Sequence, residues 1–197
     1  MKRVFDVFVS CIILLLLFPF FLLIALFIFI DSGSPIFYRQ TRVGLNNIDF
    51  QLFKFRTMHT HADKLGLLTV GGRDPRITKV GYFLRKYKLD ELPQFMNVLQ
   101  GNMSIVGPRP EVRKYVNMYS SEQLKVLSVK PGITDESSIK FSNESDLLAS
   151  AENPEEYYIQ VLLPQKVEQG INYSKNATIR NDIRIIIYTF LKIIKQR

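Results

Sequence analysis

Two adjacent carboxylates, Asp90 and Glu91, follow three cations in the segment Arg85-Lys-Tyr-Lys-Leu-Asp-Glu-Leu-Pro-Gln94. Pro93 indicates that a helix begins here, because a proline in the first helical turn forfeits no hydrogen bond. Asp90 would then lie near the N-cap and Glu91 just inside, where free backbone N–H groups attract phosphate. Neighbouring cations lower the pKa of a carboxylate and keep it ionised.

This pattern suits phosphate chemistry of two kinds. An ionised carboxylate held beside a phosphoryl group can attack it. Two carboxylates can also hold Mg²⁺, which neutralises charge on a transferring phosphate. The structural alternative is an acidic helix start that only complements the helix dipole, and the decapeptide alone leaves both interpretations open.

Two further segments supply cations of the kind that bind phosphate. Phe53-Lys-Phe-Arg-Thr-Met58 alternates aromatic and basic residues, as a half-exposed strand does, and it places Lys54 on one face. Gly107-Pro-Arg-Pro-Glu111 fixes Arg109 between two prolines, and a rigid backbone around an arginine suits bidentate phosphate binding. The alternative for the second segment is a structural turn.

The net charge of +8 is concentrated in one block. Residues 39–88 carry eleven basic and three acidic side chains, whereas the segments before and after this block are neutral overall. Such a block should face something anionic, which can be lipid headgroups, a phosphorylated substrate or nucleic acid.

An apolar run from Val7 to Ile30 precedes this block and contains no charged side chain. About 20 apolar residues suffice to cross a bilayer, and Pro19 at the middle predicts a kink. Basic residues, which mark the cytoplasmic side, flank both ends of the run. A re-entrant helix, which enters and leaves the membrane on the same face, places both basic flanks on the cytoplasmic side and is favoured. A simple span is the alternative. Ser10 is a candidate partner for the carbonyl that Pro19 frees.

The remaining pattern predicts a small α/β domain that is mostly helical. The domain would cover residues 32–197 and follow a membrane element at residues 1–31. The predicted strands are Pro35–Tyr38, Phe50–Phe55 and Met103–Val106, with a turn at Gly44–Asn47 and an extended stretch after Lys130–Ile133. The predicted helices are Met58–Leu65, Ile77–Arg85, Leu92–Leu99, Glu111–Leu127, Pro154–Gly170 with a bend at Pro164, and Thr178–Ile194.

The last of these helices combines apolar residues at helical spacing with several arginines and lysines. It can pack on the core with a solvated basic face, or it can lie on an anionic lipid surface. The two interpretations are compatible. The single Cys11 lies in the apolar run and excludes a disulfide framework.

Taken together, these segments resemble the bacterial sugar transferases, the monotopic polyprenyl-phosphate phosphoglycosyl transferases. The resemblance runs from Lys2 to about Ile194. Its motifs are Lys2-Arg-Val-Phe-Asp6, Arg42-Val-Gly44, Phe53-Lys-Phe-Arg-Thr-Met58, Asp74-Pro-Arg-Ile-Thr78, Leu84-Arg85, Leu89-Asp-Glu-Leu-Pro-Gln94, Asn97-Val-Leu99, Met103-Ser104, Val106-Gly-Pro-Arg-Pro110 and Lys130-Pro-Gly-Ile-Thr134.

The resemblance implies transfer of a sugar-1-phosphate from a nucleotide-diphosphate sugar, usually a UDP-sugar, to membrane polyprenyl phosphate, with release of UMP. It implies that Asp90 is the nucleophile that forms a covalent aspartyl-phosphosugar and that Glu91 positions Mg²⁺ with it. Lys54, Arg85 and Arg109 would bind substrate phosphate.

By the same resemblance, Arg3, Asp6 and Pro19 belong to a re-entrant membrane element, and the catalytic domain lies on the cytoplasmic face of the bacterial inner membrane. The reaction would be the first membrane step of surface glycan or exopolysaccharide assembly.

Two stretches depart from the family pattern. Phe18 precedes Pro19 where many members carry serine, and Asp135 to Asn143 replaces a glycine-rich stretch, so neither receives a role by resemblance.

Two other classes of function are alternatives to a transferase. A membrane-tethered nucleic-acid binder would use the block at 39–88 for phosphate contacts, and we expect no nucleic-acid partner. A catalytically silent scaffold of a glycan assembly complex would keep its partners without the two carboxylates. The expected partners are the nucleotide sugar, polyprenyl phosphate and membrane lipids, and the long apolar helices leave room for a homodimer.

Overall fold

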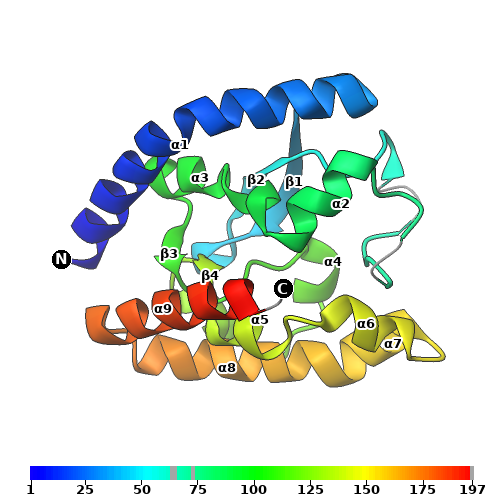
Figure 1. Ribbon diagram of the computed structural model, residues 1–197. Coiled ribbons are helices and arrows are strands. Elements are labelled where there is room, and N and C mark those ends of the chain that lie inside the picture. The colour runs from blue at the N-terminus through cyan, green and yellow to red at the C-terminus, as the bar shows by residue number, and fades with distance from the viewer. Residues whose placement is uncertain (63–65, 72–73, 196–197) are drawn as a thin grey trace.

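The computed structural model describes residues 1–62, 66–71 and 74–195. The fold is mostly helical, with two small two-stranded sheets between the helices. Figure 1 shows the long helix α1 along one side, the helices α8 and α9 along the opposite side, and the first sheet with α2 and α3 between them.

The helices in chain order are α1 (Lys2–Ser32), α2 (Lys79–Lys86), α3 (Gln94–Gln100), α4 (Arg113–Val116), α5 (Glu136–Lys140), α6 (Glu144–Ala149), α7 (Pro154–Tyr157), α8 (Leu163–Lys175) and α9 (Ile179–Lys195). The strands are β1 (Phe37–Val43), β2 (Asp49–Phe55), β3 (Ser104–Val106) and β4 (Gly132–Thr134). Short 3₁₀ turns cover Leu45–Asn47, Leu89–Glu91 and Gln123–Ser128, and a π-helical turn covers Tyr158–Leu162.

Strands β1 and β2 form an antiparallel hairpin in which Tyr38 lies opposite Lys54. Asn46 and Asn47 turn the chain with positive φ angles, which asparagine tolerates better than most residues. The free edge of β2 is closed by the buried side chain of Asn97 on α3. Its amide oxygen accepts from the Phe53 N–H at 2.9 Å and its amide nitrogen donates to the Gln51 carbonyl at 2.7 Å.

Strands β3 and β4 pair in parallel, with Val106 opposite Thr134. After β3, the Gly107-Pro108 segment also contacts the start of β4, where the Gly132 N–H donates to the Pro108 carbonyl at 3.0 Å. Here two backbones meet without room for a side chain. A Cβ on Gly132 would lie 2.1 Å from the Gly107 nitrogen, and a Cβ on Gly107 would lie 2.4 Å from the Lys130 carbonyl oxygen. The two glycines therefore permit the close approach that sets the direction of the Arg109 segment.

Helix α1 is continuous through Pro19, and its ribbon changes direction part-way along its length (Figure 1). It is the one helix in the described part of the chain that is long and apolar enough to cross a membrane. Most of its large apolar side chains are exposed to the surroundings, whereas Asp6, Ser10 and Ile28 are buried. The helix thus contacts the domain mainly near its two ends.

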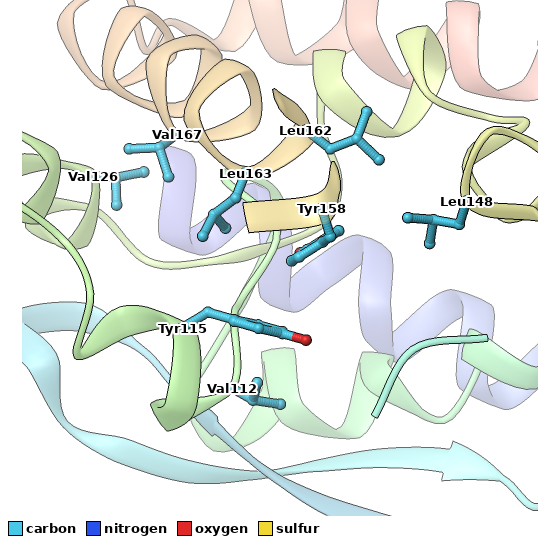
Figure 2. Close-up of a cluster of buried hydrophobic side chains, with 8 residues drawn as sticks. All are labelled: Val112, Tyr115, Val126, Leu148, Tyr158, Leu162, Leu163 and Val167. Atoms are coloured by element: carbon cyan, nitrogen blue, oxygen red, sulfur yellow. The ribbon is translucent and has the colours of Figure 1, made fainter. Parts of the chain in front are cut away.

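One hydrophobic cluster lies between α8, α4 and α6, at the side of the domain opposite α1. The rings of Tyr115 and Tyr158 pack with their centroids 4.9 Å apart. Figure 2 shows these two rings with the aliphatic side chains of the cluster. Two further clusters hold the hairpin and β3 against α9, and β2 against α1 and α2. Burial of these apolar side chains is the main force that orders the short elements.

The structure confirms the mostly helical α/β class and most of the predicted elements. Strands β2 and β3 and the helices near 79–86, 94–100 and 179–195 lie within a few residues of their predicted bounds, whereas β1 continues to Val43, five residues beyond its predicted end at Tyr38. Pro164 lies at the start of α8, directly after the π-helical turn, which accommodates the hydrogen bond that this proline cannot make.

Two predicted helices are wrong. Glu111–Leu127 is not one helix, because the side chains of Ser120 and Gln123 bond each other's backbone N–H and begin a separate turn. In Met58–Leu65 the described part is a β-bridge from Met58 to Ile77 followed by turns, and residues 63–65 lie outside the described residues.

Candidate active site

Asp90 and Glu91 lie in the 3₁₀ turn Leu89–Glu91. Helix α3 begins only at Gln94, with Pro93 as its N-cap, so the acidic pair precedes the helix. The prediction of an acidic pair at a helix N-terminus is therefore wrong in detail. Lys88, with φ of 56°, introduces the turn, and the Glu91 N–H donates to its carbonyl. The turn directs both carboxylates into the domain, where Asp90 is 4% and Glu91 8% exposed.

Two of the predicted cations meet at Glu91. Lys54 from β2 contacts the Glu91 Oε1 atom with its Nζ at 2.7 Å. Arg109, from the segment after β3, donates to Oε1 at 2.5 Å and to Oε2 at 3.3 Å. Three segments far apart in the sequence thus converge on one carboxylate.

Asp90 is held differently from its neighbour. Its nearest cation is Lys54, at 3.9 Å from Oδ2, and its carboxylate accepts no hydrogen bond from any described residue. A buried carboxylate without such bonds keeps its lone pairs available for another electrophile or cation. The two carboxylates therefore differ: Glu91 is bonded by two cations, whereas the oxygens of Asp90 are available to a ligand.

The pKa values of the two carboxylates shift in opposite directions. Burial raises the pKa of Asp90, and Lys54 offsets this only in part. Burial also disfavours ionised Glu91, but Arg109 and Lys54 outweigh it and hold its pKa well below the ordinary value. The prediction that cations lower both pKa values is thus right for Glu91 and wrong for Asp90. The Lys54 pKa is itself lowered, because burial outweighs both carboxylates.

Arg85, the third predicted phosphate-binding residue, lies farther from the pair. It donates to the Thr69 hydroxyl at 2.9 Å, and its positive charge lowers the pKa of Asp90. Lys88 acts on both carboxylates in the same sense. Its place two residues before Asp90 was a signal that sequence reasoning could have used for a site role.

Asp135 is a further residue that sequence reasoning left without a role. Its carboxylate accepts from the Arg109 backbone N–H at 3.2 Å, from the Ser137 hydroxyl at 2.6 Å and from the Ser138 N–H at 2.8 Å. It therefore caps α5 and at the same time fixes the backbone that carries Arg109. The contact crosses from β4 to the segment after β3, so sequence spacing gave no signal for it.

Arg109 also lines a cavity that neither Asp90 nor Glu91 lines. Its lining includes the polar or charged side chains of Arg109, Glu111, Tyr119, Asp135 and Lys166, together with the prolines that flank Arg109. Asp90 and Lys54 do not line it. Arg109 thus connects the cavity to the acidic pair.

Two of the three predicted membrane residues, Arg3 and Asp6, anchor α1 to the domain, whereas Pro19 is exposed. Arg3 donates to the carbonyls of Val98 at 2.6 Å and Leu99 at 3.1 Å, and Asp6 accepts from the Ser104 hydroxyl at 2.7 Å. Ser10 does not serve the carbonyl freed by Pro19, because its buried hydroxyl has no partner among the described residues.

A sequence profile described as bacterial sugar transferase matches residues 1–196. The chain belongs to the bacterial sugar transferase family. The acidic pair, Lys54, Arg85 and Arg109 therefore lie in the fold of a sugar transferase.

Among the relatives of this sugar transferase are two named UDP-glucose:undecaprenyl-phosphate glucose-1-phosphate transferase. The one from Escherichia coli is 36% identical over 98% of this chain and 40% of its own length, and the one from Caulobacter vibrioides is 35% identical over 95% and 67%. A third, from Aeromonas hydrophila, is named UDP-N-acetylgalactosamine-undecaprenyl-phosphate N-acetylgalactosaminephosphotransferase and is 33% identical over 98% and 43%. The chain thus spans about two fifths of two of these relatives and two thirds of the other.

Proposed function

We propose that this protein transfers a sugar-1-phosphate from a UDP-sugar to a membrane polyprenyl phosphate and releases UMP. The observation that carries the proposal is that the two carboxylates of the acidic pair have different surroundings. Glu91 is saturated by two cations, whereas the adjacent Asp90 is buried, carries a raised pKa and accepts no hydrogen bond from the described residues. The names of the relatives supply the classes of donor and acceptor.

In the first step, a carboxylate oxygen of Asp90 attacks the phosphorus atom that bears the sugar. A bond forms between this oxygen and phosphorus, and the bridging P–O bond to UMP breaks, so UMP leaves with the electron pair. In the second step, an oxygen of polyprenyl phosphate attacks the same phosphorus atom and expels the Asp90 carboxylate. An acyl phosphate is a good phosphoryl donor, which makes this two-step route chemically reasonable.

Lys54 and Arg109 are suited to the charge that develops in both steps. Their bonds to Glu91 keep Lys54 3.9 Å from Asp90 and Arg109 on the adjacent carboxylate before substrate binds, so little reorganisation is needed when a diphosphate arrives. Ionised Glu91 is what retains them in this buried place. We therefore assign Glu91 the role of holding the phosphate-binding cations in position.

The residues present fit a Mg²⁺ ion that a diphosphate would bring with it, because such ions take one or two carboxylates plus phosphate oxygens. Asp90 has free oxygens for this purpose, and Glu91 would exchange one of its cation contacts. No group of three or more histidine, cysteine or acidic side chains able to hold a metal occurs among the described residues. When bound, Mg²⁺ would neutralise charge on the diphosphate.

The position of α1 supports the proposal that the protein enters one leaflet and leaves on the same side. At ~1.5 Å per residue, a straight helix of 31 residues has ends far enough apart to reach both bilayer surfaces. Yet Arg3 at one end and Asp31 at the other both bond to the same domain, Asp31 through the Val80 N–H at 3.0 Å. We therefore favour a re-entrant α1, with the domain on the cytoplasmic face.

Helix α9 agrees with an additional contact to the bilayer surface. Ile183, Ile187, Phe190 and Leu191 are exposed on it, and basic residues lie among them in the sequence. Such a face suits anionic lipid headgroups. The interfacial position of α9 and the possible homodimer both remain predictions.

The direct test of the proposed function is a screen for UMP release in detergent with Mg²⁺, polyprenyl phosphate and a panel of UDP-sugars. We expect UMP release that requires a donor and increases with the acceptor, and UDP-glucose and UDP-N-acetylgalactosamine are the first donors to try. No UMP with any donor would contradict the proposal. A silent scaffold would retain its partner contacts after Asp90 and Glu91 were both replaced.

The pKa shift of Asp90 gives a second test of the proposal. Because the nucleophile must be ionised, kcat/KM should fall on the acid side through the raised pKa of Asp90. Lys54→Met removes the largest opposing charge, so this acid limb should move to higher pH. Lys88→Met should move it in the same direction but less, because its effect on Asp90 is smaller. An acid limb that stayed in place or moved to lower pH would contradict the assignment.

A further inference from the structure

Arg56, the residue after β2, is 5% exposed and binds the end of α1. Its guanidinium donates to the carbonyl oxygens of Ser32 at 2.8 Å, Gly33 at 2.6 Å and Ser34 at 3.0 Å. It also donates to the Ser32 hydroxyl at 2.8 Å. Four acceptors at the exit of one helix are thus gathered by a single side chain from a strand.

The end of a helix suits this cation for two reasons. The last carbonyls of a helix have no partner within it, and they carry the negative end of the helix dipole. Arginine can satisfy several of them because its donors lie in a rigid planar fork, which lysine lacks. Burial lowers the pKa of Arg56, and the charge of Asp31 on the last turn of α1 opposes that effect. Arg56 therefore binds the end of α1 strongly and with a fixed direction.

The last two residues of β2, directly before Arg56, face opposite sides of the strand. Phe55 is 1% exposed and packs edge-on against Phe21 of α1, with ring centroids 5.2 Å apart. Lys54, one residue earlier, points the opposite way because side chains alternate along a strand, and it contacts Glu91. The end of β2 is therefore a short rigid connection between α1 and the acidic pair.

The acidic turn is connected to α1 in the same way. Leu89 packs in the cluster formed by Ile28, Phe55 and Leu84, while the adjacent Asp90 enters the site. A shift of the second half of α1 relative to the domain would therefore reach both Lys54 and Asp90. The first half is held separately by Arg3 and Asp6. Loss of the Arg56 contacts would therefore loosen only the second end, which Asp31 still bonds to the Val80 N–H.

We infer that Arg56 is a positioning residue, which locks the exit of α1 to β2 and so sets the depth of Asp90 relative to an acceptor embedded in the bilayer. The inference rests on the proposed function, in which the acceptor is a membrane lipid phosphate. Arg56 touches neither carboxylate of the pair, and its bonds run to α1 and the segment that follows. It acts through the position of the membrane element.

The test compares two acceptors with the same donor. Turnover is measured with long-chain polyprenyl phosphate in nanodiscs and with a short, water-soluble prenyl phosphate, for wild type, Arg56→Met, Arg56→Lys and Arg113→Met. Arg113 is the matched control, because it too binds backbone and side-chain oxygens, at Asn47 and Asp49, but makes none of these bonds to α1.

We expect Arg56→Met to lower the ratio of nanodisc to soluble-acceptor turnover by about tenfold or more, because misplacement of about 1 Å can cost a hundredfold. Arg56→Lys should lie between it and wild type, and Arg113→Met should keep the wild-type ratio. An equal fall with both acceptors would mean that Arg56 supports the fold or the chemistry alone, and would overturn the inference, as would no change in the ratio.

A second measurement does not depend on activity. Spin labels at Leu22→Cys on α1 and Lys86→Cys on α2, both exposed positions, are introduced into a Cys11→Ser background. In nanodiscs, the distance distribution between them should broaden in Arg56→Met and stay narrow in Arg113→Met. An unchanged distribution in Arg56→Met would overturn the inference. If wild type were inactive with every donor and acceptor, the proposed function would be contradicted instead. The distances between the two spin labels would then decide whether Arg56 holds the end of α1.

Discussion

Asp90→Asn is expected to abolish turnover, with kcat lower by about 10⁴-fold or more, because the amide cannot act as the nucleophile. The folded state should not suffer. The raised pKa of Asp90 means that its ionised form is disfavoured in the fold, so stability falls as the pH rises from 3.8 through the folded-state pKa. A neutral isostere avoids that loss, and we expect an equal or higher Tm near neutral pH.

The experiment pairs UMP release with thermal unfolding and with intact mass after incubation with donor alone. Wild type should gain the mass of a sugar phosphate, and Asp90→Asn should not. Asp49→Asn is the control, since Asp49 is exposed and, among the described residues, its side chain bonds Arg113 alone. It should keep turnover within about twofold of wild type. Wild-type turnover in Asp90→Asn, with deamidation excluded by mass, would refute the nucleophile assignment.

Arg109→Met is expected to have the next largest effect, a fall in kcat of about 10²–10³-fold, because a donor aimed at developing phosphate charge is lost. Stability should also fall, by about 1–3 kcal/mol, since Glu91 is left buried with Lys54 as its remaining partner. Arg109→Lys should recover part of both losses, because it keeps the charge but not the two-point contact.

The pH dependence of this stability loss identifies its cause. Arg109 holds the Glu91 pKa below 4.5, so the stabilisation is fully present above that value and is lost as the pH falls through the folded-state pKa. The difference in free energy of unfolding between wild type and Arg109→Met should therefore shrink in acid. A difference that was constant with pH would mean that Arg109 stabilises the fold by packing and not through Glu91.

The parts of the site that depend on residue type were predictable from sequence. A strand that alternates cations with aromatics, an arginine between prolines and an acidic pair each carry a local signal, and Lys54, Arg109 and Glu91 do meet. The signal is local because strand alternation and proline rigidity act over a few residues.

The parts that depend on which segments become neighbours were not predictable. Asp135, after β4, accepts from the backbone N–H of Arg109, after β3. Arg56, after β2, binds the end of α1 next to the cis Ser34-Pro35 bond. No rule of sequence spacing connects the residues of either contact. The opposite pKa shifts of Asp90 and Glu91 also follow from burial, which a sequence of charges does not contain. The basic residues next to the acidic pair correctly predicted a lowered pKa for Glu91, but they wrongly predicted a lowered pKa for Asp90.

The side chain of Asn97 has a consequence for solubility. An unpaired strand edge attracts strands from other molecules, and a chain with an exposed apolar helix is already prone to association before it reaches a bilayer. One amide occupies the Phe53 N–H and the Gln51 carbonyl on the outer edge of β2, as a neighbouring strand would. A single residue thus closes these two positions of the β2 edge to pairing with a strand of another molecule.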